Sequence, residues 1–221
     1  MSGLDGLRVL VTAGPTREHL DSVRFLSNPS TGRMGYAMAE EAAARGARVM
    51  LVSGPTTLPD PAGVEIERVT SAEEMLAACR RRFTACEVLV AVAAVADVRP
   101  VRRHAEKLKK QAIGSTLELE PTADIVATLA ADKDRRFIVG FAAETTDLLA
   151  SAAAKMKRKG LDLIVANDVG DPAVGFGSVD NRVVVLDPDG SRLELGPAPK
   201  RVIAAGIWTA IEARLTHRRL R

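Results

Sequence analysis

Residues 8–53 read RVLVTAGPTREHLDSVRFLSNPSTGRMGYAMAEEAAARGARVMLVS, and this stretch decides the fold. It opens at residues 8–13 with a short β-branched run that a Gly-Pro pair ends, which is typical of a buried parallel strand. Strong helix formers follow at residues 31–45, and Gly46 is a natural residue for the helix end. A second apolar run occupies residues 48–53. Strand, helix and strand in this order predict two parallel strands joined by a right-handed crossover.

The same alternation of apolar strands and helices continues to the end of the chain. The sequence SAEE at residues 71–74 is a capping box, which predicts the start of a helix. The turn DPDG at residues 187–190 predicts a β-hairpin. Residues 99–114 are basic and lack a persistent apolar period, so we expect a mobile loop there. Further strands are predicted at residues 64–69, 87–93, 137–141, 162–166, 181–186 and 192–195, and further helices at residues 71–83, 124–131, 147–159 and 200–215.

These elements predict an α/β fold in a single domain that spans residues 1–221. The expected architecture is a Rossmann-like, doubly wound and mostly parallel sheet with an antiparallel hairpin at one edge. Open sheets of this kind bind ligands beyond the carboxyl ends of their strands. Chemistry is therefore expected in the loops that follow Ala13, Ala96 and Phe141.

The composition argues against several other classes of protein. The chain is 47% hydrophobic and 27% charged, as soluble globular proteins are. Its longest apolar run, residues 88–96, is far shorter than the roughly 20 residues of a membrane-spanning helix, so no membrane association is expected. The net charge is +3, but aromatic residues make up only 3% and do not alternate with the basic clusters, so no nucleic-acid partner is expected. Two cysteines without a disulfide or zinc spacing, and a start without a secretory signal, favour the cytoplasm.

The start of the helix predicted at residues 31–45 has the composition of a phosphate-binding site. Small residues and hydroxyls at a helix N-terminus leave backbone N–H groups free, and the helix dipole favours an anion there. The residues expected to bind phosphate are Gly14, Ser30, Thr31, Gly32, Arg33 and Gly35.

An NAD(P)-dependent oxidoreductase is the main alternative, because the glycines near Gly32 resemble a dinucleotide fingerprint. In that fingerprint the glycines begin directly after the first strand, whereas a long irregular stretch separates Gly14 from Gly32. The second strand has no acidic residue at its end for a ribose, and the single tyrosine, Tyr36, belongs to no Tyr-x-x-x-Lys pair. The oxidoreductase is therefore the weaker hypothesis, and a non-catalytic nucleotide-binding module also stays open.

Several longer motifs run along the chain in order. They are VTAGPTRE at 11–18 with LDSVRFLSN at 20–28, AAVAD at 93–97, KLKK at 107–110, ADIV at 123–126, GFAAET at 140–145 and LIVAND at 163–168. With these motifs the chain resembles the bacterial phosphopantothenoylcysteine synthetases. The resemblance extends from Arg8 to Leu215 and is much more specific than a lone glycine pattern.

The resemblance implies a ligase of coenzyme A biosynthesis. Members of this family use CTP with Mg²⁺ to convert the carboxylate of phosphopantothenate into an acyl-cytidylate, with loss of pyrophosphate. The amine of L-cysteine then attacks the acyl group, and CMP is released. The resemblance also implies a homodimer. Most bacterial relatives are bifunctional and carry a flavin-dependent decarboxylase, so we expect this chain to be either one half of such a fusion or a monofunctional form. CTP rather than ATP rests on the bacterial character of the motifs, because no single residue decides the base.

The resemblance also implies roles for individual residues. Lys107 matches the family's catalytic lysine, whose charge assists activation and whose loop can close over the triphosphate. Asn28 matches an essential asparagine that holds the acyl carbonyl while the amine approaches, and Arg24 is the further catalytic residue beside it. No residue is singled out as a metal ligand. Nucleotide binding is expected of Ala91, Val92, Ala93, Asp97, Lys107, Ala123, Asp124, Ile125, Val126, Phe141, Lys155 and Lys159.

Taken without the resemblance, some of these residues have ordinary structural explanations. Asn28 precedes a proline and suits an Asx turn, and Phe141 suits a hydrophobic core. Lys155 and Lys159 are one helical turn apart and suit a solvated helix face.

Asp97 follows an apolar strand, so its carboxylate is expected to face the ligand crevice and to bind ribose, base or magnesium.

Overall fold

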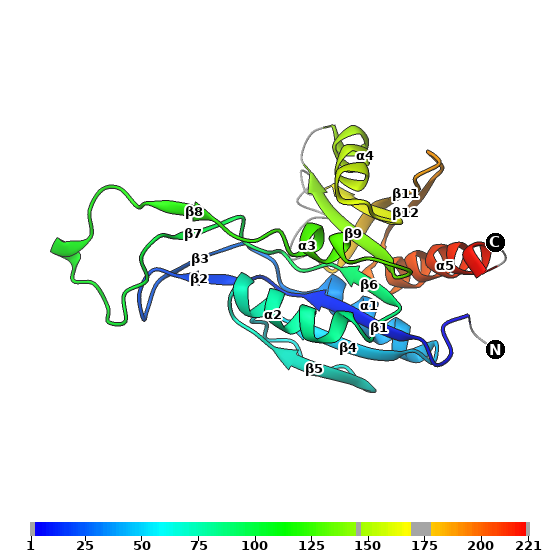
Figure 1. The fold of residues 1–221 in the computed structure, drawn as a ribbon, viewed down its shortest axis with the longest axis horizontal. Coiled ribbons are helices and arrows are strands. Elements are labelled where there is room, and N and C mark those ends of the chain that lie inside the picture. The colour runs from blue at the N-terminus through cyan, green and yellow to red at the C-terminus, as the bar shows by residue number, and fades with distance from the viewer. Residues whose placement is uncertain (1–2, 145–146, 169–177, 220–221) are drawn as a thin grey trace.

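The computed structural model describes residues 3–144, 147–168 and 178–219 of the 221-residue chain. An eight-stranded sheet forms its body (Figure 1). Its strands are β1 (Arg8–Ala13), β4 (Arg48–Ser53), β5 (Val64–Arg68), β6 (Val88–Ala91), β9 (Phe137–Glu144), β10 (Leu163–Asp168), β11 (Asp180–Leu186) and β12 (Arg192–Pro199). Their order is β12-β11-β10-β9-β6-β1-β4-β5. The strands from β10 to β5 are parallel, and β11 and β12 pair antiparallel at the edge, so the predicted fold class is confirmed.

Helices cover both faces of this sheet, as in doubly wound folds. They are α1 (Arg33–Ala44), α2 (Ala72–Phe83), α3 (Ile125–Ala131), α4 (Leu148–Lys159) and α5 (Lys200–Arg219). One core lies under α1 and α5 and the other under α2, α3 and α4. Val9 and Val11 of β1 belong to the first core and Leu10 to the second, because successive side chains of a strand point to opposite faces. Trp208 of α5 is fully buried, and its Nε1 donates to the Met38 carbonyl oxygen of α1 at 2.8 Å.

A narrow arm extends away from the sheet (Figure 1). It contains β2 (Arg17–His19) paired with β3 (Phe25–Ser27), β7 (Val98–Pro100) paired with β8 (Leu119–Pro121), and a 3-10 turn η1 (Lys110–Ala112). The prediction of one irregular loop at residues 99–114 is therefore wrong at its start, which belongs to β7, and at η1. Arg99 pairs with Glu120 across the two strands, and Arg99 Nε lies 2.8 Å from Glu120 Oε1. This pairing joins residues distant in sequence, so local periodicity does not reveal it.

The other predicted elements are present with shifts at their ends. β6 stops at Ala91 rather than at residue 93, and the Ala93 N–H instead donates to the Thr12 side-chain oxygen at 3.2 Å. β9 and α5 each run a few residues further than predicted. The motif at residues 140–145 ends on Thr145, which lies outside the described residues. In the part of the chain that the structure describes, no helix is long and apolar enough to cross a membrane.

Candidate active site

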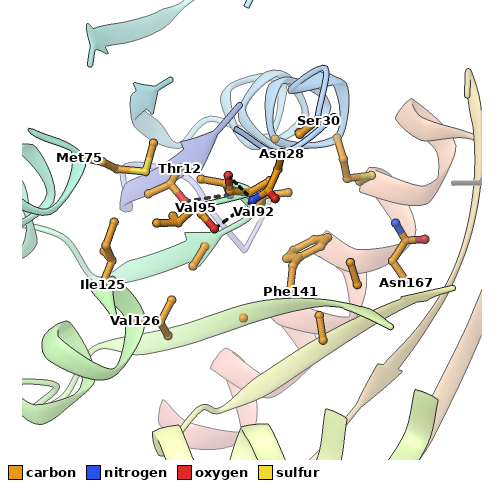
Figure 2. Close-up of a pocket in the computed structure, with 18 of the residues that line it drawn as sticks. Thr12, Asn28, Ser30, Met75, Val92, Val95, Ile125, Val126, Phe141 and Asn167 are labelled. Carbon is orange, nitrogen blue, oxygen red and sulfur yellow. Dashed lines mark hydrogen bonds between the residues drawn. The ribbon is translucent and has the colours of Figure 1, made fainter. Parts of the chain in front are cut away.

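A cavity of about 460 Å³ opens at the carboxyl ends of β1, β6, β9 and β10. It lies at the point where the strand order reverses, because β4 and β5 follow β1 on one side and β6, β9 and β10 continue on the other. Doubly wound folds bind their ligands at such a switch point. Figure 2 shows Asn28, Val126 and Phe141 around this hollow, each from a different segment. The cavity lies where the strand pattern predicted chemistry.

The start of α1 forms one wall of the cavity and suits an anion. Gly32, the residue before the helix, has a φ of 79°, and a Cβ there would lie 2.7 Å from Thr56 Cγ2. A Cβ on Gly35 would lie 2.5 Å from the Ala13 Cβ, so only glycine lets α1 approach β1 this closely. No side chain caps α1, and its first turn contains no acidic residue. Its first backbone N–H groups are thus available to a phosphate.

All the residues predicted to bind phosphate except Gly14 line this cavity. Gly14 lies behind the start of α1, because a Cβ built on Gly32 would come within 3.3 Å of the Gly14 Cα. Its own φ is 76°, and a Cβ there would lie 3.0 Å from the Gly54 carbonyl oxygen. Gly14 is therefore packed between Gly32 and Gly54 and is not part of the cavity lining. The lining residues of this group are Ser30, Thr31, Gly32, Arg33 and Gly35.

Asn28 reaches the cavity from the loop after β3, and its amide nitrogen is already held. Nδ2 donates to the carbonyl oxygens of Ala94 and Val95, at 3.2 and 3.1 Å. Because carbonyl oxygens only accept hydrogen bonds, these contacts determine the amide orientation. Oδ1 is then the side-chain atom without a partner in the described part of the chain. From the sequence, the Asn28 amide was predicted to donate a hydrogen bond to the ligand. In the folded chain the atom left for a ligand is Oδ1, which is an acceptor.

The residues predicted to bind the nucleotide, apart from Lys107, come together around the cavity. They come from β6 and the loop after it, from the start of α3, from β9 and from α4. Phe141 also packs against the core beneath the site, so its two interpretations are compatible. The lining residues of this group are Ala91, Val92, Ala93, Asp97, Ala123, Asp124, Ile125, Val126, Phe141, Lys155 and Lys159.

Two lysines of α4 line the cavity, and each has a partner. Lys159 Nζ lies 2.7 Å from Asp124 Oδ2, and the lysine side chain is only 12% exposed. Asp124 also caps α3, because its Oδ1 accepts from the Ala127 N–H at 3.0 Å. Lys155 Nζ donates to the Phe141 carbonyl oxygen at 3.2 Å. These lysines are thus fixed in the wall of the cavity and do not form a freely solvated face.

The pKa of Asp124 is held below its usual value of 3.8. Burial alone would raise this pKa, but the Ala127 N–H and the ammonium groups of Lys159 and Lys155 together lower it by more. The Asp124 carboxylate therefore stays charged at neutral pH.

Lys200 is a cavity residue that the sequence did not reveal. It is the first residue of α5, and its Nζ donates to the carbonyl oxygens of Ser178 and Asp180. Burial lowers the pKa of Lys200, and the nearby charge of Arg33 lowers it further. Two cations thus meet at one end of the cavity, where they favour a polyphosphate. Lys200 lies far from the other motifs in the sequence, so no local signal marks it.

Thr12, Asn167 and Asn181 also line the cavity without having been predicted. Asn167 has a buried Oδ1 with no hydrogen-bond partner among the described residues, which marks a polar group that a ligand can satisfy. It belongs to the motif at residues 163–168, so a signal for it was present in the sequence. Asn181 is 1% exposed and follows the first residue of β11, where only the tertiary structure relates it to the site.

Lys107 and Arg24, both predicted to be catalytic, lie on the arm and not in the cavity lining. Arg24 Nη2 donates to the Leu108 carbonyl oxygen at 2.7 Å and also lies 3.0 Å from Asp21 Oδ2. Lys107, the residue before Leu108, is exposed. The fold thus brings Arg24 to the segment that carries Lys107, and neither residue is among those that line the cavity with Asn28.

A second hollow of about 440 Å³ lies between the arm and the start of α2. Arg99 in this hollow pairs with Glu73 at 3.0 Å and with Glu120 at 2.8 Å, so its charge is compensated. The N-terminus of α2 is closed by the predicted capping box of Ser71 and Glu74. This hollow therefore offers no uncapped helix start of the kind that lines the main cavity.

The carboxylates of the main cavity do not form a metal site by themselves. Among the described residues, no group of three or more His, Cys, Asp or Glu side chains could hold a metal ion. Asp124 is engaged by Lys159, whereas the Asp97 side chain has no hydrogen bond or ion pair within the described ranges. Asp97 is thus the uncommitted carboxylate of this wall.

Residues 4–215 match the protein family described as "DNA/pantothenate metabolism flavoprotein C-terminal domain". The chain belongs to this family. The match covers the cavity and the arm, so both are parts of the DNA/pantothenate metabolism flavoprotein C-terminal domain.

Two curated relatives show how close the similarity is. The "Coenzyme A biosynthesis bifunctional protein CoaBC" of Bacillus subtilis (strain 168) is 48% identical over 211 residues, covering 95% of this chain and 52% of the relative. The protein of the same name from Escherichia coli (strain K12) is 46% identical over 197 residues, covering 87% of this chain and 48% of the relative. The chain therefore spans about half the length of the curated relatives it matches.

Solved structures of other proteins have a fold similar to that of this chain. The crystal structure of the C-terminal domain of CoaBC is similar with a TM-score of 0.84 at 41% identity, covering 98% of this chain and 100% of that one. A mutant of Cab2, in complex with phosphopantothenate-cysteine, has a TM-score of 0.76 at 19% identity, covering 96% of this chain and 89% of that one. At 19% identity, the similarity to Cab2 shows a shared fold.

Proposed function

We propose that this chain is a phosphopantothenate–cysteine ligase, which joins phosphopantothenate to L-cysteine with CTP through an acyl-cytidylate and releases pyrophosphate and CMP. The observation that carries the proposal is the cavity at the switch point of the sheet. It combines the uncapped start of α1, the anchored lysines of α4 and Asn28 in a chain that is 48% identical to a CoaBC protein. The Cab2 complex with phosphopantothenate-cysteine has the same fold and supports the substrate class.

In this proposal, different parts of the cavity bind different parts of the nucleotide. The start of α1 and the cations Arg33 and Lys200 receive the phosphates, because free N–H groups and positive charge favour them. Lys155, Lys159 and the start of α3, which line the same cavity, receive the ribose and base. In this arrangement the α-phosphate lies near Asn28 and the end of β6, where the carboxylate of phosphopantothenate must approach.

Mg²⁺ is part of the proposal, and the donor set fits it as a companion of the triphosphate. Magnesium is usually bound by one or two carboxylates together with substrate phosphates. Asp97 is the cavity residue that would hold it, since Asp124 is already paired with Lys159. When bound, the ion would neutralise the charge of the triphosphate against the incoming carboxylate.

Asn28 acts in the second half-reaction. Its Nδ2 is anchored to the Ala94 and Val95 carbonyls, so its Oδ1 is fixed in position and can accept a hydrogen bond from the amine of cysteine. An accepted hydrogen bond orients the lone pair of the amine toward the acyl carbon. The anchored amide therefore positions the nucleophile, rather than polarising the acyl carbonyl as the sequence suggested.

We also propose a homodimer formed through the arm. Several apolar side chains of the arm are exposed, among them Val23 at 56%, Val101 at 47% and Leu119 at 45%. Apolar groups gathered on a thin extension favour a partner surface. The arm of a second copy also gives Lys107 a route to a cavity whose described lining does not include it within its own chain.

Mixing two inactive proteins tests this arrangement. An Asn28→Asp variant and a Lys107→Gln variant, unfolded and refolded together, would regain about a quarter of wild-type activity if the two residues act on one cavity from different chains. Recovery of no activity in mixed dimers, verified by differently tagged subunits, would contradict it. Light scattering gives the oligomeric state independently.

The bifunctional names of the relatives support the further proposal that the native protein also contains a flavin-dependent decarboxylase.

The oxidoreductase is disfavoured by the position of Tyr36. This single tyrosine is 4% exposed, and its hydroxyl lies 3.1 Å from Ser53 Oγ at the end of β4. It accepts a further hydrogen bond from Thr56 at 3.1 Å. The tyrosine is thus a structural tie between α1 and β4 and is not free to transfer a proton to a substrate.

One incubation tests the proposed function. The protein is mixed with phosphopantothenate, L-cysteine, Mg²⁺ and CTP, with ATP or NADPH replacing CTP in parallel. We expect phosphopantothenoylcysteine by mass spectrometry and pyrophosphate that depends on phosphopantothenate. Folded protein that forms no product with either nucleotide would overturn the ligase, and a change in nicotinamide absorbance would favour the oxidoreductase.

A further inference from the structure

A fully buried carboxylate lies in the arm, a part of the chain where most side chains are exposed. Asp21 is 0% exposed, although Ser22 and Val23 beside it are exposed. A charged group is costly to bury unless several donors compensate it. The groups around Asp21 therefore indicate what its burial achieves.

One oxygen of Asp21 serves the local turn. Oδ1 accepts from the backbone N–H groups of Val23 and Arg24, each at 2.8 Å. This is an Asx-type turn between β2 and β3, which many surface loops form with an exposed aspartate. The turn alone requires neither complete burial nor the second oxygen.

The other oxygen reaches a segment that is distant in sequence. Oδ2 accepts from the Leu108 N–H at 3.1 Å and lies 3.0 Å from Arg24 Nη2. Arg24 Nη2 in turn donates to the Leu108 carbonyl oxygen at 2.7 Å. Asp21 and Arg24 thus hold both polar groups of residue 108, and the His104 N–H adds a bond to the Leu20 carbonyl oxygen at 2.9 Å.

We propose that Asp21, acting with Arg24, is a positioning residue that fixes Lys107 by clamping the backbone of Leu108. The inference rests on the proposed function, in which Lys107 assists the activation step. A lysine has many rotamers, and its reach is defined only if the backbone that carries it is fixed. The clamp makes the turn after β2 and the lysine segment one unit, which explains why the predicted catalytic Arg24 lies here and not in the cavity.

Electrostatics agree with a permanently charged clamp. Burial would raise the pKa of Asp21, but the backbone N–H groups of Val23, Arg24 and Leu108 and the charge of Arg24 lower it below 3.8. Both carboxylate oxygens of Asp21 therefore remain hydrogen-bond acceptors throughout the physiological pH range.

Asp21→Asn is a sharp test because four donor contacts surround the carboxylate. An amide offers one acceptor oxygen, so in either orientation its NH₂ group faces at least one pair of N–H donors. Glu118→Gln is the matched control, since it removes an exposed carboxylate of the same arm that makes no side-chain hydrogen bond or ion pair among the described residues. Arg24→Met is a second, milder variant that leaves the backbone donors to Asp21 in place.

Three measurements are made on each variant of the 221-residue chain. Hydrogen exchange of peptides covering residues 104–110 is expected to be at least about 10-fold faster in Asp21→Asn and intermediate in Arg24→Met. The kcat for product formation is expected to fall at least about 10-fold, because Lys107 acts in the activation step. The Kd for CTP is expected to change less than about twofold, because the residues that line the cavity are unchanged. Glu118→Gln is expected to match the wild type in all three.

Unchanged exchange at residues 104–110 in Asp21→Asn would overturn the clamp itself. Faster exchange with unchanged kcat would overturn its role in positioning Lys107. Equal loss of CTP affinity and of kcat, with a lowered Tm, would show a merely structural residue. If the wild-type protein makes no product at all, the proposed function fails, whereas the exchange measurement still decides whether the clamp exists.

Discussion

Lys159 Nζ lies 2.7 Å from Asp124 Oδ2, and this contact ties the last turn of α4 to the residue that caps α3. The two helices meet at one wall of the cavity, so the ion pair shapes the site as well as joining its elements. Its partners were predicted separately as nucleotide-binding residues, and their mutual contact is a property of the folded chain.

Lys159→Met should lower the thermal stability in a pH-dependent way. The pKa of Asp124 is lowered by folding, so the contribution of the charged carboxylate is complete above its usual value of 3.8 and is lost as the pH falls through the lowered value. The Tm difference between wild type and variant should therefore be largest near neutral pH and shrink below about pH 4. Scanning calorimetry from pH 2.5 to 7 measures it. A difference that grows on acidification would contradict this account, and Lys157→Met, on the same helix, is the control.

Asn28→Asp should stop the reaction after activation. The carboxylate oxygen that replaces Nδ2 would face the carbonyl oxygens of Ala94 and Val95 and be repelled, so the side chain loses its anchor. Overall turnover should fall by about 100-fold or more, as when a positioned polar group is lost from an active site. Quenching after a single turnover should reveal accumulated acyl-cytidylate by mass spectrometry. If activation fails as completely as product formation, Asn28 acts in binding or folding and not in the amine step.

Lys107→Gln should have the opposite signature. It removes the positive charge that assists attack on the α-phosphate while retaining most of the side chain, so activation itself should slow. No acyl-cytidylate should accumulate, and pyrophosphate release should fall in parallel with product. Wild-type pyrophosphate release in this variant would remove Lys107 from the mechanism.

Gly35→Ala should destabilise the fold and loosen the phosphate loop. The added methyl group would lie 2.5 Å from the Ala13 Cβ and 3.0 Å from the Thr12 carbonyl oxygen, so α1 must move away from β1. Overpacking of this kind costs about 1–3 kcal/mol of unfolding free energy. Urea denaturation measures the cost, and calorimetry should show weaker CTP binding. Gly114→Ala is the control, because no atom within 3.7 Å opposes a Cβ there and its effect should stay within about 0.5 kcal/mol. Equal stabilities of the two variants would contradict the close approach.

Lys200→Gln should weaken the binding of CTP more than that of CMP. If Lys200 and Arg33 hold the terminal phosphates, removing one charge should cost about 10-fold in CTP affinity and little for the monophosphate. The salt dependence of CTP binding should also become shallower, since one fewer cation takes part. Titration calorimetry with both nucleotides at two salt concentrations measures this. The same loss for CTP and CMP would place Lys200 outside the phosphate site, and Arg201→Gln on the next residue is the control.

Cys79 and Cys86 should be inert in the folded protein. Burial raises the pKa of Cys79 to about 12 and that of Cys86 to about 11, and neither side chain is more than 7% exposed. Because the thiolate is the reactive form, a disulfide reagent at pH 8 should label both only upon unfolding. Absorbance of the released thiol, with and without guanidinium, measures it. Rapid labelling under native conditions would show that α2 opens readily.

Much of the candidate site was predictable because it follows motifs at the ends of strands. Asp97, Phe141 and the residues that open α3 were named from the sequence and do line one cavity. Hydrophobic periodicity identifies the strands, and the carboxyl ends of parallel strands necessarily meet at one edge of the sheet. Gly14 was predicted with them but is not among the residues that line the cavity, because a glycine in a turn after β1 can equally well face a ligand or support the loop that binds it.

The sequence by itself determined the alternation of strands and helices, the family, and the side chains capable of the chemistry, because periodicity, caps and motifs are local properties of the chain. Tertiary structure decided which of these side chains share a space. It added Lys200 and Asn167 to the cavity, turned the spare atom of Asn28 from a donor into an acceptor, and held Lys107 beside Arg24 on the arm. It also buried Asp21 against Leu108. Such contacts join residues far apart in sequence, and their geometry depends on the packing of the whole sheet and arm, which no local pattern encodes.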